Sequence, residues 1–418
     1  MEKLKKIFSP AFWTDRRTLL VLWLLLPIVA SLTKLHKYNN YLIFKYTFWH
    51  AWEGTSLYAA YPDQYADTNH YGPLFSLLIA PFAIQPVEWI GLLLWHLALA
   101  MLLYWAIRKD SFTPRQQTFM LLFCAHELLT AIFMSQFNIA VVAMILLTYH
   151  FVRKEKDVWA TLFIVIGTLV KLYGIVGLVF FLCSKHKGKF IAWFVVWSAV
   201  LFCAPMLISS PEYIVDQYKE WGMALTEKNG DNLFATHQNI SLLGLIRKVG
   251  YAVSVGLTTY RTQFWGEGVP QDPGNVWTCY GDILVILPAM LLFALPLLRF
   301  KQWKNDAFWQ TILASVLMFV CLFSTGSESS GYIIALIGVV IWYTACPWKR
   351  GRWDIALMVL AFVLTSLSPS DLMPAVLRRD WIQPFALKAL PVAIIWLKLS
   401  IELLYKPYES AAHVNAEA

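Results

Sequence analysis

Residues 158–183 read VWATLFIVIGTLVKLYGIVGLVFFLC, an apolar run in which Lys171 is the only charged residue. Basic clusters flank both ends of the run, at residues 153–156 and 185–189. Positive charges beside membrane segments stay in the cytoplasm, so the run has to cross the membrane an even number of times. Each half would be about 13 residues, or roughly 20 Å of helix, which is short for a hydrocarbon core of about 30 Å. The pattern predicts a kinked or re-entrant pair of half-length helices that turns near Lys171.

The composition of the whole chain also indicates a membrane protein. Of its 418 residues, 58% are hydrophobic and only 14% are charged, and its mean hydropathy is +0.55. Apolar runs recur between residues 18 and 405 and leave no room for soluble domains of ordinary size. We expect one all-α polytopic domain over residues 1–418, with about 10–13 transmembrane or half-membrane helices. The run at 73–84 contains Pro73 and Pro81, and is predicted to dip into the membrane or to break at proline.

The formal net charge of +8 does not indicate nucleic-acid binding, because the basic residues lie in short loops beside apolar runs. The positive-inside rule places these loops, and both chain termini, in the cytoplasm. The polar segments without basic clusters then fall on the opposite side of the membrane. They are residues 35–72, 135–138, 209–282, 324–332 and 368–385, together with Lys171. This convergence predicts a functional site at the non-cytoplasmic ends of the helices.

The first extracytoplasmic loop, residues 35–72, is rich in tyrosine and tryptophan. It also carries side chains suited to proton transfer, namely Glu53, Asp63, Asp67 and His70. A carboxylate or imidazole beside a bound hydroxyl can act as a general base, and aromatic rings offer stacking faces for sugars. The aromatic spacing in Phe44–Trp52 fits an amphipathic helix at the membrane surface instead. We therefore expect the chemistry in the later part of the loop, Asp63–Pro73.

Two further motifs carry polar side chains at the same face. Gln136 and Asn138 lie between two apolar runs, where their amides could bind the hydroxyls of a ligand or cap a helix. Lys171 lies among apolar residues, where a charge is costly without a partner. It either contacts a phosphate, helped by the N-terminus of a half-helix, or extends its ammonium group to the membrane surface from a helix end.

Residues 236–248 predict the start of an amphipathic helix within the long extracytoplasmic segment 209–282. Polar side chains gather at its head and apolar ones follow; the polar ones are His237, Asn239 and Ser241. A helix of this type lies at the membrane surface and presents its polar end to the site. The sequence SESSGY places Glu328 and Tyr332 at the mouth of a later apolar run, where both are candidates for binding substrate.

Several motifs of soluble catalysis are missing from the sequence. It contains no glycine pattern for nucleotide phosphates or dinucleotides, and no HExxH or GxSxG motif of zinc or serine hydrolases. No segment is left for a soluble domain that binds a sugar nucleotide. Any sugar donor therefore has to reach the site from the membrane.

The order of these elements resembles the GT-C glycosyltransferases, most closely the polyprenol-phosphate-mannose-dependent mannosyltransferases of family 87. The resemblance covers residues 20–340 and rests on Gly54, Tyr58, Tyr71-Gly72-Pro73, Ser135-Gln136-Phe137-Asn138, Lys171 and Asn239-Ile240-Ser241 with Arg247. It implies a GT-C-like fold and transfer of a hexose, expected to be mannose, from a polyprenyl-phosphate donor to a hydroxyl of an extracytoplasmic lipid or glycan acceptor. It also implies a bacterial plasma (inner) membrane and no cofactor or metal.

One position departs from the family pattern. The family carries an aspartate, taken to be the catalytic base, where this chain has Asn40, and an amide cannot accept a proton in that role. Asn40 would then bind substrate, and the base is expected among the other acids of the loop, with Asp67 first and Asp63 or Glu53 in reserve. Alternatively, the register differs or the protein is not a catalyst of this type. A membrane transporter or a lipid-linked-sugar flippase would also use broken helices and buried charges.

Overall fold

A computed structural model describes residues 9–34, 37–234, 238–266 and 277–409. Within these residues the regular structure is helical and contains no strand, which confirms the prediction of an all-α polytopic membrane protein. Those described helices that are long and apolar enough to cross a membrane are Arg16–Thr33, Glu88–Ile107, Lys187–Leu207 and Gly281–Leu298. The chain forms two compact units, Met1–Thr226 and Glu227–Ala418. The prediction of a single domain over all 418 residues stays a prediction.

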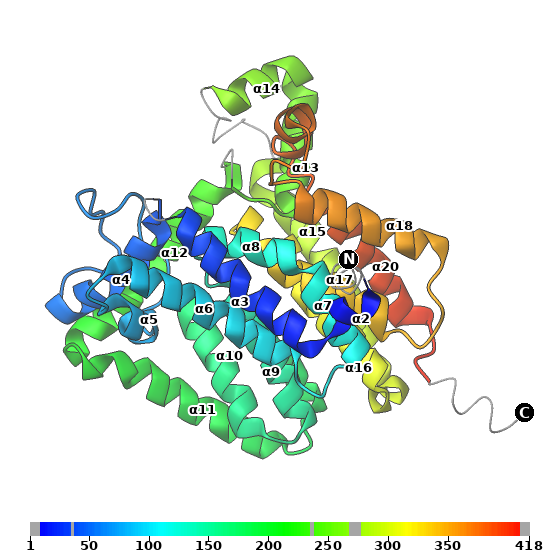
Figure 1. Ribbon diagram of the computed structural model, residues 1–418, viewed down its shortest axis with the longest axis horizontal. Helices are drawn as coiled ribbons and strands as arrows, with labels where there is room; N and C mark the ends of the chain where they lie inside the picture. Colours follow the sequence, from blue (N-terminus) through cyan, green and yellow to red (C-terminus); the bar gives the residue numbers. More distant parts are fainter. Residues whose placement is uncertain (1–8, 35–36, 235–237, 267–276, 410–418) are drawn as a thin grey trace, which may run out of the picture. The chain divides into compact units, whose positions relative to one another are not determined.

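Unit 1 holds the blue to green helices of Figure 1. They are α2 (Pro10–Thr14), α3 (Arg16–Thr33), α4 (Asn39–Glu53), α5 (Phe75–Ala83), α6 (Glu88–Ile107), α7 (Pro114–Phe123), α8 (Ala125–Phe133), α9 (Asn138–Arg153), α10 (Asp157–Lys171), η1 (Tyr173–Cys183), α11 (Lys187–Cys203), η2 (Ala204–Leu207) and the start of α12 (Pro211–Phe234). Unit 2 holds α13 (Leu242–Val255), α14 (Leu257–Trp265), α15 (Trp277–Ala294), η3 (Leu295–Leu298), η4 (Phe300–Lys304), α16 (Asp306–Leu322), η5 (Ser329–Gly331), α17 (Tyr332–Ala345), α18 (Arg352–Leu360), η6 (Ala361–Leu367), α19 (Ala375–Leu377), η7 (Arg378–Ile382) and α20 (Ala389–Tyr405).

The apolar run that contains Lys171 folds as predicted. α10 ends at Lys171, Leu172 adopts a left-handed backbone conformation with φ 56°, and η1 begins immediately afterwards. The two half-length helices pack closely, because a Cβ atom added at Gly174 would overlap the backbone of Gly167. η1 therefore folds back along α10, which confirms the half-length pair and its turn.

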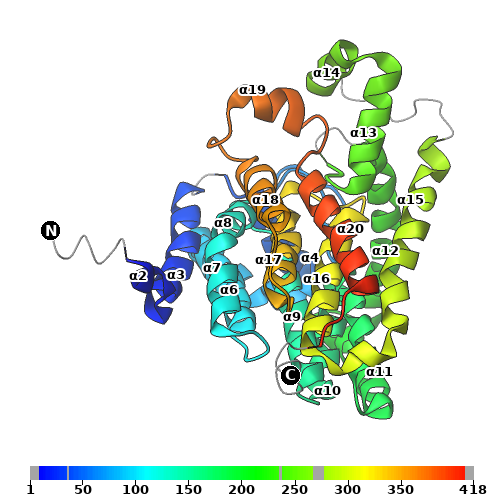
Figure 2. The same cartoon turned by 90° about the vertical axis from the view of Figure 1, so that its right-hand side faces the viewer.

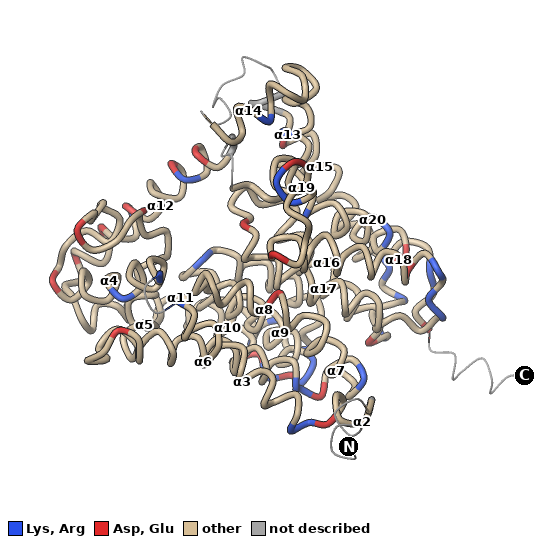
Figure 3. The backbone as a smooth tube through the Cα atoms, turned by 45° about the horizontal axis from the view of Figure 1, so that its top comes forward, with Lys and Arg blue, Asp and Glu red and all other residues tan. Residues whose placement is uncertain are grey.

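The basic loops of unit 1 lie together at one end of its helices. Asp110, after α6, pairs with Lys154, after α9, at 2.7 Å. Glu155 pairs with Lys185, after η1, at 2.6 Å. Since α9 begins at Asn138 and ends at the basic loop, that loop and the polar motif lie at opposite ends of the helix. In Figure 3, charged residues lie around α7 and the start of α3 and, apart from these, around α4 and α12, whereas α6 is tan over most of its length.

Unit 2 shows the same separation by itself. Its helices α16, α17 and α20 lie side by side (Figure 2). Arg299 donates to a backbone carbonyl just after α20 at 3.0 Å, and Arg350 pairs with Glu402 near the same helix end. Lys388 immediately precedes α20 and donates to the Ser329 carbonyl at 2.8 Å. In each unit, the basic loops and the predicted polar motifs therefore occupy opposite helix ends.

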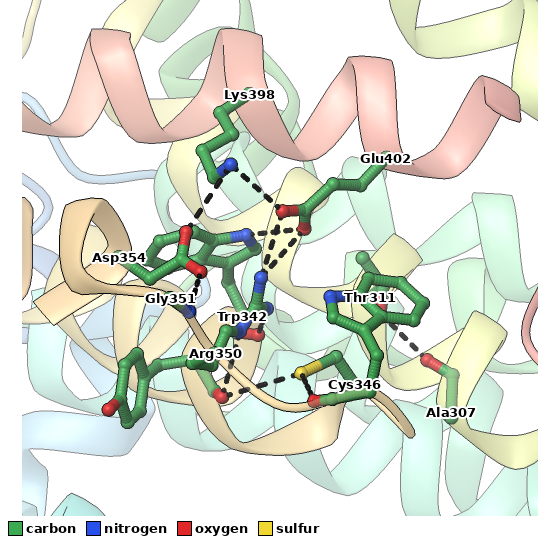
Figure 4. A network of polar contacts seen from close by, with 11 residues as sticks. Ala307, Thr311, Trp342, Cys346, Arg350, Gly351, Asp354, Lys398 and Glu402 are labelled. Atoms are coloured by element: carbon green, nitrogen blue, oxygen red, sulfur yellow. Dashed lines mark hydrogen bonds and ion pairs between the residues drawn. The ribbon is translucent and has the colours of Figure 1, made fainter. Parts of the chain in front are cut away.

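A buried ion pair ties the end of α20 to α17 and α18 (Figure 4). The Arg350 guanidinium donates to both carboxylate oxygens of Glu402, at 2.9 and 3.0 Å. The Trp342 indole donates to the same carboxylate at 2.8 Å, and Lys398 Nζ lies 3.5 Å from it. The side chains of Arg350 and Glu402 are only 6% and 7% exposed, so these contacts replace most of their lost hydration.

We expect Glu402→Gln to lower the free energy of unfolding by about 3–5 kcal/mol, because it leaves the buried Arg350 guanidinium without its counter-charge. Thermal unfolding of the purified protein in detergent measures the loss. Glu155→Gln is the matched control, since its pair with Lys185 is exposed and such pairs contribute about 0–1 kcal/mol. Equal losses in the two variants would show that the network of Figure 4 does not stabilise the fold.

Residues 35–72, predicted to form the first extracytoplasmic loop, contain more helix than their composition indicates. α4 buries Tyr41, Phe44, Phe48 and Ala51, as the amphipathic spacing in Phe44–Trp52 predicts. Only from Gly54, which has φ 70°, does the segment become irregular. α5 lies beside α4 (Figure 1) and has nine residues, or roughly 14 Å of helix, which cannot cross a membrane. It continues through Pro81, so the expected break at proline does not occur.

Candidate active site

The candidate site of unit 1 forms where three turns meet. The Gly72 amide donates to the carbonyl of Val170, in the last turn of α10, at 2.9 Å. A Cβ atom at position 72 would overlap the carbonyl oxygen of Leu169 and lie 3.1 Å from the Trp221 ring. Glycine therefore lets the loop lie directly against the end of α10. This contact brings the neighbouring Tyr71 to Lys171.

Tyr71 connects the three turns. Its hydroxyl donates to Gln136 Oε1 at 3.0 Å, and Lys171 Nζ lies 5.3 Å from the centre of its ring. Asn69 accepts from the Tyr71 amide at 3.0 Å, and the Tyr58 hydroxyl donates to the Tyr71 carbonyl at 2.9 Å. Burial raises the pKa of Tyr58 well above its ordinary value, so this hydroxyl keeps its proton and continues to donate.

We expect Gly72→Ala to reduce activity more than it reduces stability, because the added methyl group has to push the Tyr71 turn away from α10. Transfer rates and thermal unfolding, measured on the same purified sample, separate the two effects. Gly222→Ala in α12 is the matched control, since nothing lies within 4 Å of a Cβ atom there. Full activity of Gly72→Ala would contradict the role given to this contact.

The ammonium group of Lys171 lies near two aromatic rings, those of Tyr71 and Tyr173. The residue is half-buried at the end of α10, and its Nζ is 5.6 Å from the centre of the Tyr173 ring on the far side of the turn. Rings that face an ammonium group stabilise it by about 0.5–2 kcal/mol. The N-terminal turn of η1 begins just after the lysine. An ammonium group beside a helix N-terminus is suited to binding a phosphate.

Side chains of α12 anchor the loop between α4 and α5. The Tyr213 hydroxyl donates to the Thr55 carbonyl at 2.6 Å, and the Trp221 indole donates to the His70 carbonyl at 3.0 Å. Between them, Gln217 and Glu220 accept from Leu57 and Ser56, each at 2.7 Å. The path of the loop from α4 to His70 is therefore held by one helix. The His70 ring itself lies 3.5 Å from the Thr68 hydroxyl.

The first turn of α4 holds the backbone beside Asp67. The Asn39 side chain exchanges hydrogen bonds of 2.8 and 2.7 Å with the backbone of Ala66. Asp67 follows in the left-handed conformation, with φ 74°, and its Oδ1 accepts from the Thr68 amide at 2.8 Å. The carboxylate is exposed. An exposed acid is thus held beside the N-terminal end of α4.

Asn40 contacts the next turn of the site. Its amide donates to the carbonyl of Met134 at 2.8 Å, and Met134 leads into the turn that carries Gln136. The first turn of α4 consequently contacts both the Asp67 segment and the Gln136 segment. Position 40, where the resemblance implies an acid, directly follows Asn39, the residue that pairs with Ala66.

The two other carboxylates of the loop lie toward the opposite end of α4. Glu53 is the last residue of this 15-residue helix, roughly 21 Å from its start. Asp63 precedes Gln64, whose side chain contacts His50 in the last turns of α4 at 2.8 Å. Burial lowers the pKa of His50. Both carboxylates are exposed, but only Asp67 lies at the end of α4 that contacts the Gln136 turn.

The amides of the 135–138 motif do not cap α9. This helix begins at Asn138, and no side-chain hydrogen bond caps its N-terminus. Gln136 accepts from Tyr71 instead. Asn138 is 3% exposed, and its Oδ1 has no hydrogen-bond partner within the described part of the chain. A buried acceptor without a donor is unfavourable, so a bound hydroxyl would stabilise this position.

In unit 2, the predicted residues gather around Ile240. The Tyr332 hydroxyl donates to the Ile240 carbonyl at 2.6 Å, and the Ile240 amide donates to the Ser327 carbonyl at 2.7 Å. These bonds hold the segment before α13 against the segment before α17. Glu328 lies half-buried in the latter.

Ser241 begins the predicted amphipathic helix. Its hydroxyl accepts from the Gly244 amide at 3.0 Å and donates to Asn239 Oδ1 at 2.6 Å, so α13 starts at Leu242 rather than at residue 236. Lys248, one turn further on, donates to the carbonyl of Gln238 at 2.9 Å. Burial lowers the pKa of Lys248 to about 8. His237 lies outside the described residues.

Lys388 is a residue that the sequence analysis missed. Its Nζ donates to the Ser329 carbonyl at 2.8 Å and lies 5.3 Å from the centre of the Tyr332 ring. Lys171 has the same distance to Tyr71 in unit 1. Lys388 is only 3% exposed. Its one signal in the sequence is a single cation at the start of the last apolar run, which also fits an ordinary helix end.

Backbone conformation marks the same segments independently. Left-handed residues other than glycine are uncommon and concentrate at functional sites, because the surrounding structure has to stabilise them. In the described residues they are Asp67, Ser135, Glu155, Leu172, Asn239 and Ala386. All but Glu155 and Ala386 belong to motifs that the sequence singles out.

The model of glycosyltransferase family 87 matches residues 69–325, more than half of the chain. The match is shorter at both ends than the predicted span 20–340, and it leaves out Asp67 and Glu328. It includes Tyr71, Gln136, Asn138, Lys171, Asn239 and Ser241. A search of the curated proteins found no match. On the strength of the family match, this chain is a member of glycosyltransferase family 87.

Proposed function

We propose that the protein transfers a hexose, mannose in the first instance, from a polyprenyl-phosphate donor to a hydroxyl of a lipid or glycan acceptor outside the cytoplasm. The observation that carries the proposal is the contact of the Tyr71-Gly72 turn with the end of α10, which brings an aromatic ring and the Lys171 ammonium group together. A cation at a helix end in a membrane protein is accessible to a phosphate that is itself anchored in the membrane. The family match supports a glycosyltransferase.

In the proposed reaction the acceptor oxygen forms a bond to C1 of the sugar while the bond from C1 to the phosphate oxygen breaks. The bonding electron pair leaves with the polyprenyl phosphate, and Lys171 offsets the negative charge that develops there. The acceptor proton passes to a carboxylate acting as general base. The protein thus has to supply a cation on the donor side and a base on the acceptor side.

Asp67 is the proposed base, with Asp63 and Glu53 in reserve. Two observations support this order: the anchoring of Ala66 by Asn39, and the contact of the same helix turn with Met134. Asp67 would then act from a place close to position 40, where the resemblance implies the acid of the family. Asn40 is proposed to contact substrate as a hydrogen-bond donor.

The remaining residues are proposed to bind the sugar and its phosphate. In unit 1, the buried Oδ1 of Asn138 is suited to accept a hydrogen bond from a sugar hydroxyl. Gln136, Tyr71 and His70 belong to the turns that meet at this site. For unit 2, taken by itself, Asn239, Ser241, Glu328 and Tyr332 are proposed as substrate-binding residues, together with His237. No cofactor or metal takes part in this proposal.

The proposed location is a bacterial plasma membrane with both chain termini in the cytoplasm. The separation of basic loops and polar motifs at opposite helix ends supports this orientation in each unit. A transporter or lipid-linked-sugar flippase remains the alternative class. It lacks the support that the family match gives to glycosyl transfer.

Purified protein in sealed proteoliposomes, supplied with labelled polyprenyl-phosphate mannose, glucose and arabinose, tests the donor class. Sugar nucleotides of the same sugars are the matched control. We expect label to move from a polyprenyl-phosphate sugar into a lipid or glycan fraction and not from any nucleotide. Transfer from a sugar nucleotide would overturn the proposed donor, and movement of intact donor across the bilayer without transfer would favour the flippase.

A further inference from the structure

A histidine inside the membrane helix α6 is completely buried and takes no part in the proposed reaction. His96 is 0% exposed. Its Nδ1 lies 2.8 Å from the Ser31 hydroxyl of α3, and its Nε2 lies 2.9 Å from the Ser135 hydroxyl. Polar side chains are costly inside a membrane protein and are usually retained for a function. His96 therefore needs an explanation beyond core packing.

The hydrogen-bond partners fix which nitrogen of His96 carries the proton. The Ser31 hydroxyl donates to the Pro27 carbonyl at 2.8 Å, so its oxygen is left to accept from Nδ1–H. In a neutral imidazole the other nitrogen is then an acceptor. The Ser135 hydroxyl accordingly donates to Nε2. The ring thus holds Ser135 in place through one directed hydrogen bond from that serine.

Ser135 needs such support because its backbone is left-handed, with φ 52°. Residues with a Cβ atom are disfavoured in this conformation, whereas glycine adopts it readily. α6 binds two polar groups of Ser135: His96 accepts from the hydroxyl, and the neighbouring Trp95 indole donates to the carbonyl at 3.0 Å. Two adjacent residues of one helix therefore hold the turn.

The backbone conformation of Ser135 sets the direction of the Gln136 side chain. Gln136 follows directly and accepts from the Tyr71 hydroxyl at 3.0 Å. Tyr71 in turn lies 5.3 Å from Lys171 Nζ, measured to the ring centre. A change of backbone conformation at Ser135 would move Gln136 and release Tyr71.

We propose that His96 is a positioning residue of the glycosyltransferase site, which keeps Ser135 left-handed so that Gln136 holds Tyr71 beside Lys171. The inference rests on the proposed function of that site. It assigns His96 no contact with substrate and no proton transfer to it. If His96 only filled the core, the loss of the Ser135 hydroxyl would matter and the left-handed turn would not. Ser135→Ala and Ser135→Gly would then lose equal activity.

The substitutions Ser135→Ala and Ser135→Gly separate these two roles. Both remove the hydroxyl from His96, but only glycine retains the left-handed turn without support. We expect Ser135→Ala and His96→Ala to lose about 10²-fold in transfer rate, as misplaced catalytic groups do. We expect Ser135→Gly to keep most of the wild-type rate, and His96→Ala with Ser135→Gly to recover most of what His96→Ala loses.

Glu155→Gly is the control for the possibility that glycine at any left-handed position restores activity by stabilising the fold. Glu155 is also left-handed, with φ 57°, but lies at the basic end of unit 1. Combined with His96→Ala, it should restore no activity. Equal losses in Ser135→Ala and Ser135→Gly, or no recovery in the double variant, would overturn the positioning role.

Thermal unfolding of the same variants keeps the test independent of the proposed function. The losses in melting temperature from His96→Ala and Ser135→Ala should overlap rather than add, because both break one contact. If the wild type transfers no sugar from any donor, the proposed function fails, and the unfolding data still test whether His96 supports Ser135. Additive losses would then contradict it.

Discussion

Asp67→Asn is expected to slow glycosyl transfer by about 10²–10⁴-fold, the usual contribution of a general base. The amide keeps the size of the side chain and can still accept from the Thr68 amide, but it cannot take the acceptor proton. The loss should therefore appear in kcat, with KM for the donor little changed. Initial rates at saturating and limiting donor measure both constants.

Asp63→Asn and Glu53→Gln are the matched controls for this prediction. Both residues are exposed acids of the same loop, but Gln64 and the end of α4 hold them away from the Gln136 turn. We expect each control to keep most of its activity. A large loss in either, with Asp67→Asn active, would transfer the role of the base to that residue.

Adding Asn40→Asp to Asp67→Asn tests whether the acid has moved within the fold. Position 40 adjoins Asn39, which pairs with Ala66. We expect partial recovery, because the new carboxylate would lose the hydrogen bond that Asn40 donates to Met134. A double variant no more active than Asp67→Asn would contradict the idea that the two positions serve the same acceptor.

Lys171→Ala is expected to lower the transfer rate by about 10²–10³-fold, as the loss of one group that stabilises developing negative charge does. Lys171→Arg should retain part of the rate, because it keeps the charge, and Lys171→Gln should not. Lys109→Ala is the matched control. Its Nζ also lies over an aromatic ring, 3.7 Å from the centre of Trp105, but at the basic end of unit 1. Equal losses at both lysines would indicate a general effect of removing a stacked cation.

Local sequence patterns predict the membrane segments and the turn at Lys171 well. The turn follows from two basic loops that flank one apolar run, and this constraint involves only neighbouring residues. The separation of basic loops from polar motifs follows for the same reason. α4 was predicted in part, because its aromatic spacing is helical while its polar residues favour a loop.

Contacts between distant segments were not predictable. Asn39 and Ala66 pair across the loop, and neither has a property that indicates the other. Similarly, His96 in an apolar run gives no sign of its contact with Ser135, and Lys388 none of its contact with Ser329. These pairs arise from tertiary packing. The sequence therefore predicts the candidate acids and the preference for Asp67, but not the contacts that hold the Asp67 segment against the first turn of α4.

The measurement that tests the central claim most directly is the initial rate of sugar transfer from polyprenyl-phosphate hexoses, with wild type, Asp67→Asn and Lys171→Ala compared in the same membrane. We predict transfer by the wild type from at least one of these donors and a loss of at least about 10²-fold in each variant. No transfer from any donor, or full activity in both variants, would contradict the account.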